Sequence, residues 1–185
     1  RRRVAAAAAG GPELFAPRVA AAGLRPLDAV LDLSIPFAPS GEGLARRVER
    51  GRYRRVDWEA RLRAGGGESP LAGLGARFDV VAAHAVLPFL SPEEVARLLA
   101  DVVAVLAPSG QVVATLYLDE AGAHARRAMR HGRGRSFPDR APHHLSRAEL
   151  EERAAAAGLR VAALEEIGHP SGQRLVVLRR LSEPG

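Results

Sequence analysis

The first side chain that suggests chemistry is Asp32, which lies near the end of the apolar run 27–33 (LDAVLDL). A run of this composition is typical of a buried strand. A carboxylate at the end of a strand can accept hydrogen bonds from both hydroxyl groups of a ribose. The alternative interpretation is that Asp32 caps a turn. Asp57, which ends a second short run at 52–58 (RYRRVDW), has the same alternative.

Histidine and arginine are the other reactive side chains of interest. Histidine is the residue best suited to act as a general base near neutral pH. Each histidine has the alternative of a structural or surface role. By position, the candidates for a catalytic base are His84, His131, His143 and His144.

Arginines gather in the segment 119–142, where a guanidinium group could clamp a carboxylate or a phosphate. The alternative is a solvated helix and loop in a protein biased toward arginine. From this segment and the strand before it we take four substrate-binding candidates. They are Tyr117, Arg130, Arg133 and Arg135.

Composition excludes several classes of enzyme. The chain has no cysteine, so it has neither disulfides nor thiolate metal sites. It has no lysine, which excludes a P-loop and the Tyr-x-x-x-Lys pair of short-chain dehydrogenases. It also lacks a His-x-x-x-His pair, and we expect no metal.

The segment 77–118 predicts a strand, a helix and a second strand. We expect these elements to position the candidate residues named above. The run 78–83 is rich in valine, as in a strand that is buried on both faces. Ser91, Pro92 and Glu94 form a helix start with a capping box. Pro108 and Gly110 are expected to stop the helix before a strand at 111–118. The helix then presents one apolar face, made of Val95, Leu98, Leu99, Val102 and Leu106.

Alternating strand and helix signals continue along the whole chain, which predicts an α/β fold. Glycine turns and capping residues separate the elements. The expected helices are 14–22, 42–49 and 146–157, and the further expected strands are 4–9, 27–33, 52–58, 159–167 and 174–181. In open α/β sheets, ligands bind at the carboxyl ends of the strands, where the strand order reverses. Gly10, Asp32, Asp57 and His84 are expected to converge there.

The segment 77–118 resembles the fourth and fifth strands of class I S-adenosylmethionine-dependent methyltransferases. FDVV, an apolar loop, an SPEE helix start and a VL-x-P-x-G exit carry the resemblance, although Ala107-Pro108-Ser109-Gly110 departs from the usual Lys-Pro-Gly-Gly-like turn. The His-Pro-x-Gly-Gln turn at 169–173 is similar to that of some bacterial members. The resemblance covers almost all of residues 1–185. It implies one domain with a Rossmann-like three-layer sandwich, whose seven-stranded, mostly parallel sheet has one antiparallel strand at 174–181.

The resemblance also implies S-adenosyl-L-methionine as the cofactor and a set of residues that bind it. Asp32 would bind the ribose and Asp57 the adenine amino group, with Trp58 packed near the ring. The first glycine-rich motif is eroded, because Ala6, Ala8 and Pro12 replace an acid and two glycines. The implied cofactor-binding residues are Ala8, Gly10, Gly11, Asp32, Asp57, Trp58, Ala83 and His84.

The function implied by the resemblance is methyl transfer to a small-molecule acceptor. The eroded first motif supports a different hypothesis, a catalytically inactive methyltransferase-like domain that serves as a partner or scaffold. A weaker alternative is an RNA methyltransferase, suggested only by the number of arginines. We do not expect nucleic acid as a partner, because the arginines alternate with acidic residues, as on a solvated surface.

Location and completeness follow from simple features of the chain. No apolar run approaches the roughly 20 residues that a membrane helix needs, so no membrane partner is expected. Without a signal peptide, a cytoplasmic location is the default expectation. The chain begins at Arg1 rather than methionine, which suggests a fragment that lacks an N-terminal segment.

Overall fold

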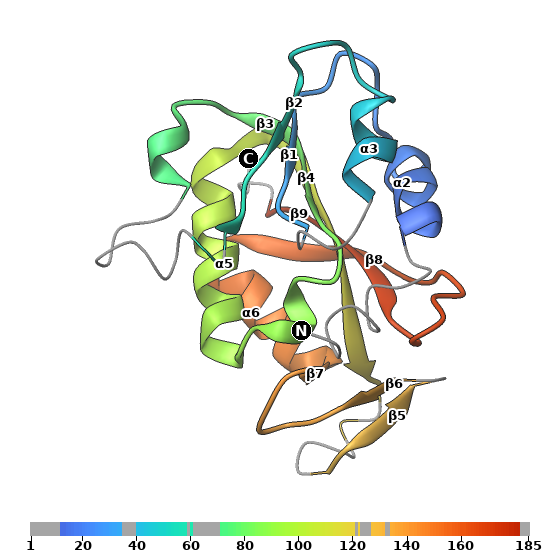
Figure 1. The fold of residues 1–185 in the computed structure, drawn as a ribbon. Coiled ribbons are helices and arrows are strands. Elements are labelled where there is room, and N and C mark those ends of the chain that lie inside the picture. Colours follow the sequence, from blue (N-terminus) through green and yellow to red (C-terminus); the bar gives the residue numbers. More distant parts are fainter. Residues whose placement is uncertain are drawn as a thin grey trace.

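A twisted sheet forms the centre of the molecule in the computed structural model (Figure 1). The structure describes residues 12–34, 40–58, 60, 71–120, 122, 127–131 and 134–181. The strands are β1 (Val30–Asp32), β2 (Tyr53–Arg55), β3 (Phe78–Ala83), β4 (Leu106–Asp119), β5 (Met129–His131), β6 (Gly134–Ser136), β7 (His144–Ser146), β8 (Leu159–Glu166) and β9 (Arg174–Arg180).

The strand order of the main sheet is β2-β1-β3-β4-β9-β8, and β7 pairs with β4 as its seventh strand. β9 is antiparallel to both of its neighbours, whereas the remaining pairs of this sheet are parallel. The expected seven-stranded, mostly parallel sheet with one antiparallel strand at 174–181 is therefore confirmed. β5 and β6 form a separate hairpin beyond the carboxyl end of β4.

The neighbours of β1 in the sheet were not predicted from the sequence. We expected the run 27–33 to be the second strand, after a first strand at 4–9. The structure pairs β1 with β2 on one side and directly with β3 on the other, Val30 lying opposite Val80. No described strand lies between β1 and β3, and residues 4–9 lie outside the described part. Strand order depends on long-range pairing, which local sequence patterns do not encode.

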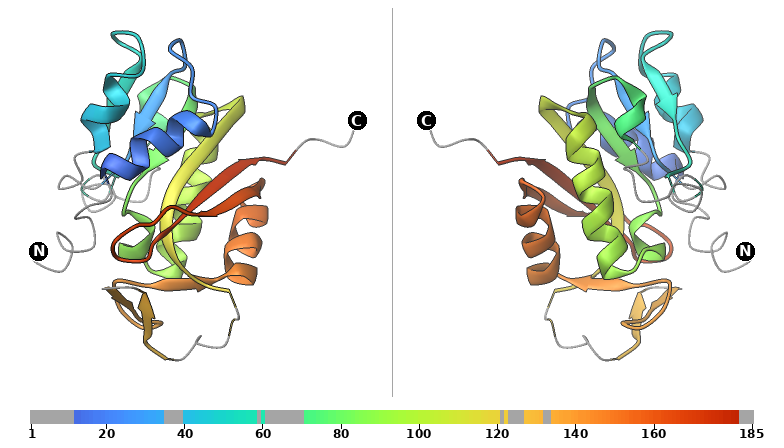
Figure 2. Two further views of the ribbon diagram at one scale, coloured as in Figure 1. Left: turned by 90° about the vertical axis from the view of Figure 1, so that its right-hand side faces the viewer. Right: turned by 90° about the vertical axis from the view of Figure 1, so that its left-hand side faces the viewer.

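Helices cover both faces of the sheet (Figure 2). The helices α2 (Pro12–Ala21) and α3 (Ser40–Ala45) pack on one face, and α5 (Pro92–Val105) and α6 (Arg147–Ala156) pack on the other. Alternate residues of β3 divide between the two cores, because successive side chains of a strand point to opposite faces. Val80 and Ala82 join the core under α2, whereas Val81 and Ala83 join the core under α5.

The predicted strand–helix–strand unit at 77–118 is confirmed, with one shift at the end of the helix. Ser91 and Glu94 form the expected capping box at the start of α5. The helix ends at Val105, before the expected stop at Pro108, and β4 begins at Leu106. The Arg180 guanidinium of β9 donates hydrogen bonds to the carbonyl groups of Val103 and Leu106. A distant side chain thus satisfies the free carbonyls at this helix end.

Short strands replace the helix and loop that we considered for the arginine-rich segment 119–142. Its described part contains the β5–β6 hairpin and leads into β7, which runs beside the end of β4. A two-stranded hairpin of three-residue strands has too weak a local pattern to be recognised from sequence. As far as the chain is described, no helix has the length and apolar character needed to cross a membrane.

Candidate functional site

The reversal of strand order in the main sheet marks where a ligand is expected. From β1 the chain moves outward to β2 and then returns to β3 on the other side of β1. In open α/β sheets the crevice beyond the carboxyl ends of strands at such a point is the usual binding place. Asp32 ends β1, and Ala83 with His84 ends β3. The structure therefore brings these predicted residues together at one edge.

The face of the sheet under α2 changes from apolar to polar toward this edge. In β3, Val80 and Ala82 are followed two residues later by His84. In β4, Val113 is followed by Thr115, which is fully buried. In β9, which runs the other way, Leu175 is preceded by Gln173. A row of buried polar side chains at the end of an apolar core is unusual, because each must find a partner.

His84 is buried with 0% exposure and has unsatisfied ring nitrogens. Neither Nδ1 nor Nε2 has a hydrogen-bond partner among the described residues. The ring stacks on Phe15 of α2 at a centroid distance of 4.9 Å and meets the His169 ring edge-on at 5.7 Å. Burial, reinforced by His169, lowers the pKa of His84 to about 3, so the ring is neutral near pH 7. Buried polar atoms without partners are candidates for ligand contacts.

A hydrogen-bonded network links the end of β3 to the turn before β9. The backbone N–H of Ala85 donates to Thr115 Oγ1 (2.8 Å), and Thr115 Oγ1 in turn donates to Gln173 Oε1 (2.7 Å). Ala85 has a φ of +56°, which is uncommon for a residue with a side chain. Backbone held in such a conformation often marks a functional site. The network therefore fixes the chain just beyond His84.

Asp32 lies at the predicted edge, but its carboxylate is already engaged within the protein. It is 0% exposed; Oδ1 accepts a hydrogen bond from the Ser34 N–H (2.8 Å) and Oδ2 accepts one from the Tyr53 hydroxyl (2.6 Å). Gly41 packs against this pair, since a Cβ there would lie 2.5 Å from the Tyr53 oxygen. Burial and the Asp32 carboxylate raise the pKa of Tyr53. The surroundings of Asp32 are those of a structural carboxylate.

Asp57 and Trp58, which follow β2, have opposite surroundings. Asp57 is exposed, and its Oδ1 accepts a hydrogen bond from the Ala60 N–H (2.9 Å). Trp58 is 1% exposed and belongs to the core under α5, where its Nε1 donates to Asp101 Oδ2 (3.0 Å). Of these two expected cofactor residues, Asp57 is therefore accessible and Trp58 is not. The remaining expected cofactor residues Ala8, Gly10 and Gly11 lie outside the described part.

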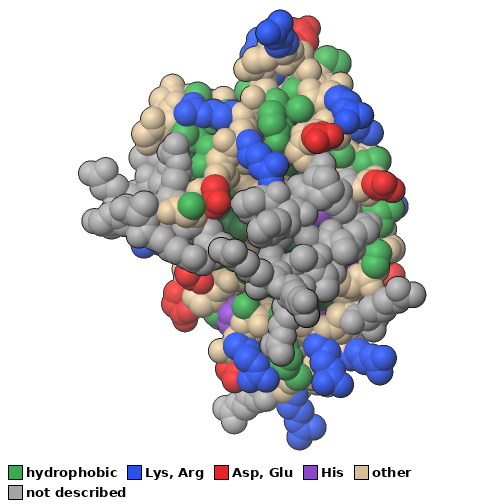
Figure 3. All heavy atoms as spheres, in the orientation of Figure 1, with side chains coloured by type: hydrophobic (Ala, Val, Ile, Leu, Met, Phe, Trp, Pro, Cys, Tyr) green, Lys and Arg blue, Asp and Glu red, His purple; other side chains and the backbone are tan. Residues whose placement is uncertain are grey.

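The candidate residues for contacting the methyl acceptor lie on two faces of the β5–β6 hairpin. His131 faces inward, and its ring lies 4.6 Å from that of the buried Tyr117. Arg130 and Arg135 are opposite each other on the exposed outer face. Basic side chains gather at the lower end of the face in Figure 3, where this hairpin lies. Arg133 is outside the described residues.

His143 and His144 open β7 but differ in their contacts. His144 is buried beside Tyr117, its partner on β4, and its Nδ1 lies 2.9 Å from Ser136 Oγ. The backbone N–H of His143 donates to the Pro88 carbonyl at 2.6 Å. Within the described part, His143 Nδ1 is buried without a partner.

Sequence reasoning missed the polar residues that connect these groups. They are Thr115, Ser136, His169, Ser171 and Gln173. The available signal was the two-residue period of β4 and β9, which places Thr115 and Gln173 on the same face as the apolar positions. No group of three or more His, Asp or Glu side chains in the described ranges could hold a metal ion.

Comparison with known proteins gives matches in structure but none in sequence. No protein-family model matches the chain, and no curated protein matches it significantly. The CcbJ methyltransferase from Streptomyces caelestis superposes with a TM-score of 0.63 at 16% identity, covering 92% of this chain and 90% of that one. The magnesium protoporphyrin IX methyltransferase ChlM from Synechocystis PCC 6803, solved with bound S-adenosylmethionine, gives 0.59 at 15% identity, covering 92% and 78%.

The pyocyanin biosynthetic protein PhzM is another similar structure, with a TM-score of 0.62 at 16% identity over 91% of this chain. Here the chain spans about half of the other protein, 55% of its length. At such identities the comparison concerns the arrangement of strands and helices, which agrees with the sheet order found above. The chain therefore has the fold of the class I S-adenosylmethionine-dependent methyltransferases, as the sequence resemblance implied.

Proposed function

We propose that this chain binds S-adenosylmethionine and transfers its methyl group to a small-molecule acceptor. The observation that carries the proposal is the reversal of strand order between β1 and β3, where the buried His84 nitrogens have no hydrogen-bond partner among the described residues. A nucleoside ligand at this edge agrees with the fold. The structures it resembles include CalO1, a methyltransferase in calicheamicin biosynthesis solved with S-adenosylhomocysteine, with which it shares 16% identity.

The residues at this edge fit the cofactor in a pattern that revises our assignment of the two aspartates. Asp32 was expected at the ribose, but its oxygens are occupied by Ser34 and Tyr53. Asp57 is exposed at the end of the neighbouring strand β2. A carboxylate there can accept hydrogen bonds from the ribose hydroxyls. We therefore assign the ribose to Asp57 and a supporting role to Asp32, which binds the Ser34 N–H and the Tyr53 hydroxyl.

Methyl transfer from a sulfonium makes few chemical demands on the protein. Bound S-adenosylmethionine supplies an electrophilic methyl group, so the protein mainly orients the two reactants. The network of Ala85, Thr115 and Gln173 holds the backbone beyond His84 in one conformation. A fixed edge of this kind is suited to positioning a ligand, because little reorganisation is needed when it binds.

The alternative of an inactive scaffold has a specific observation in its favour. The sequence between β1 and α3, residues 33–39, contains Pro36 and Pro39 and no glycine. Gly41 is required by its contacts with Tyr53 and Asp32. Prolines remove N–H donors that could bind a ligand. Binding is therefore expected to be weaker than a glycine-rich loop would give, or lost in a scaffold.

Calorimetric titration with S-adenosylhomocysteine tests the proposal and the assignment of the aspartates together. Asp57→Ala should weaken binding about tenfold to a hundredfold, the loss expected for a charge-assisted contact. Asp57 is exposed and accepts a hydrogen bond from the Ala60 N–H, so this variant should lose only about 1 kcal/mol of stability. Asp32→Ala should lower the urea midpoint more, since it leaves the buried Ser34 N–H and the Tyr53 hydroxyl without an acceptor.

Tyr53→Phe is the matched control for Asp32, because it removes one of the same hydrogen bonds and keeps the carboxylate. It should lower the urea midpoint less than Asp32→Ala does, and it should leave the contribution of Asp57 to S-adenosylhomocysteine binding unchanged. Undetectable binding by the folded parent chain would favour the scaffold. Unchanged affinity in Asp57→Ala would refute the ribose assignment while leaving cofactor binding in place.

A further inference from the structure

The β5–β6 hairpin has a polar inner face that the cofactor site does not use. Residues alternate along its short strands, so His131, Gly134 and Ser136 point to one face and the arginines to the other. His131 is half-buried, and Ser136 is 0% exposed. A hydroxyl buried so completely on a small hairpin requires partners in the body of the protein.

Two histidines are those partners, and both contact the same oxygen. His131 Nε2 lies 2.7 Å from Ser136 Oγ, and His144 Nδ1 lies 2.9 Å from it. The three residues come from β6, from β5 opposite it and from β7 on the main sheet. Their contact therefore exists only when the hairpin is docked against the end of β4.

The hairpin docks closely, which fixes the two rings. Gly172 has a φ of +77°, and a Cβ there would lie 2.7 Å from the Cβ of His131. Gly134 packs in the same way, since its Cβ would lie 2.8 Å from the Tyr117 hydroxyl. The Tyr117 ring covers His131. Side chains packed on every side can hold a defined hydrogen-bond geometry.

Chemistry restricts how protons are arranged in this chain of contacts. A serine hydroxyl has one proton, so Ser136 can donate to only one histidine and must accept from the other. If His131 donates from Nε2, Ser136 donates to His144 and the Nδ1 lone pair of His131 is free. If His144 donates instead, Ser136 donates to His131. Moving one proton across each contact interconverts these arrangements, which is the property of a proton relay.

The relay lies next to the proposed cofactor edge, connected to it by the turn 168–173. Gly172 of this turn contacts His131. His169 in the same turn meets the ring of His84 at 5.7 Å. Ser171 Oγ lies 2.8 Å from His169 Nδ1, so the turn is itself held by hydrogen bonds. The turn therefore contacts both His84 and His131.

Burial is the main reason that His131 is neutral near pH 7. Burial, with a further contribution from His144, lowers the pKa of His131 to about 4, while Asp119 acts in the opposite direction. Near pH 7 the ring therefore has a lone pair available. A base with so low a pKa holds a proton poorly. It needs a group to which the proton can pass, and Ser136 with His144 provides that path.

We propose that His131, Ser136 and His144 form a relay that removes the proton from a hydroxyl or amine acceptor during methyl transfer. This deepens the proposed function and rests on it. The acceptor oxygen or nitrogen forms a bond to the methyl carbon, and the carbon–sulfur bond breaks with its electron pair remaining on sulfur. The acceptor's proton moves to Nδ1 of His131. His131 then passes its Nε2 proton to Ser136, whose own proton moves to His144.

The relay specifies a class of acceptor. A carboxylate acceptor is already deprotonated near pH 7 and needs no base. A phenol, alcohol or protonated amine must lose a proton before or during attack. The enzyme is therefore expected to methylate a hydroxyl or amine group.

Release of S-adenosylhomocysteine tests the relay with catechol, benzylamine and benzoate as probes. The parent chain should turn over catechol or benzylamine, and His131→Gln should reduce that kcat about a hundredfold to ten-thousandfold, as for loss of a general base. Ser136→Ala should reduce kcat about tenfold or more, because His131 remains but cannot pass its proton on. Neither change should alter the affinity for S-adenosylhomocysteine.

Arg147→Gln is the control, because this exposed arginine starts α6 and pairs with Glu151 away from the relay. It should keep the parental kcat. If circular dichroism shows that Ser136→Ala is unfolded, His144→Gln takes its place. NMR of the parent with isotope-labelled histidines provides a second measurement. The tautomers of His131 and His144 must then depend on each other, as the shared contact with Ser136 requires.

Several outcomes would overturn the relay. Parental kcat in Ser136→Ala, turnover of benzoate alone, or tight binding of S-adenosylhomocysteine without turnover of catechol or benzylamine would each do so. In all of these the cofactor still binds, so the proposed function survives. Loss of S-adenosylhomocysteine binding by the parent would instead remove the proposed function and the relay together.

Discussion

The main sheet has two sides along its strand order, one formed by β1 and β2 and the other by β4, β9 and β8, and these are built in different ways. On the β1–β2 side, described at 12–34 and 40–58, the strands have three residues each. On the β4–β9–β8 side, 106–119 and 159–180, they have 14, 7 and 8 residues. Long ladders supply many backbone hydrogen bonds, whereas short strands rely on side-chain contacts. The side expected to bind the nucleoside is therefore held by a few anchors, and the acceptor side by its own backbone.

The anchors of the β1–β2 side can be named individually. The Tyr53 hydroxyl donates to Asp32 and joins β2 to β1. Trp58 donates to Asp101 and joins the end of β2 to α5. Gln111 Nε2 donates to the Ala22 carbonyl and joins the end of α2 to β4. Removal of one anchor should therefore affect this side much more than the other.

Trp58→Ala should have the largest effect on stability, and it tests the difference between the two sides most directly. The indole is 1% exposed, and its removal should lower the free energy of unfolding by about 3–5 kcal/mol. Urea denaturation measures this loss. Hydrogen exchange should show faster exchange in β1 and β2 while the β4–β9 ladder stays protected.

Trp58→Phe serves as the control for Trp58→Ala. It keeps most of the ring and loses the hydrogen bond to Asp101, so its cost should be smaller, about 1–3 kcal/mol. Equal loss of protection on both sides of the sheet would show that the two sides do not differ in the way described.

A lower pH should reduce the stability of the protein through His84, which lies at the polar edge between the two sides. The pKa of His84 is lowered from its ordinary value of 6.5 to about 3 by burial. Between these values the unfolded chain binds a proton that the folded chain does not, so stability is complete above pH 6.5 and falls as the pH decreases toward 3. At about pH 5.5 the loss from His84 should be about 1 kcal/mol.

His84→Leu isolates this contribution. The variant should be as stable as the parent near neutral pH, because the replaced nitrogens have no partners in the described residues. It should lose less stability on acidification, as read from urea midpoints at the two pH values. An acid loss identical to that of the parent would mean that His84 is charged in the folded protein.

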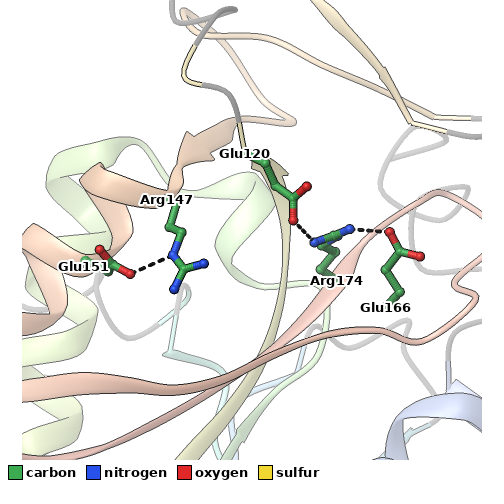
Figure 4. A network of polar contacts seen from close by, with 5 residues as sticks. All are labelled: Glu120, Arg147, Glu151, Glu166 and Arg174. Carbon is green, nitrogen blue, oxygen red and sulfur yellow. Dashed lines mark hydrogen bonds and ion pairs between the residues drawn. The ribbon is translucent and has the colours of Figure 1, made fainter.

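The smallest effect is expected from the ion pairs at the end of the β4–β9–β8 side. Arg174 of β9 pairs with Glu120 and with Glu166, as Figure 4 shows. Both carboxylates are largely exposed, and such pairs contribute about 0–1 kcal/mol. Arg174→Gln should therefore shift the thermal midpoint little, and the shift should shrink further in salt. A large shift would mean that this side, too, depends on side-chain anchors.

Local signals in the sequence determined much of this fold. The capping boxes Ser91–Glu94 and Ser146–Glu149 are both formed, because each involves residues only three positions apart. The apolar run at 78–83 forms β3 over the same residues, and the βαβ unit follows from the spacing of its elements. These features depend on neighbours along the chain, so the sequence is sufficient to predict them.

Tertiary structure alone decided which residues meet at the candidate site. Tyr53 reaches Asp32 across 21 positions, and Gln173 reaches Thr115 across 58. The same holds for the position of β1 between β2 and β3, which arises from its pairing with both strands. The His131–Ser136–His144 contact forms because a small hairpin docks on the end of β4. Such contacts depend on packing between distant elements, and no local pattern of apolar and polar residues specifies them.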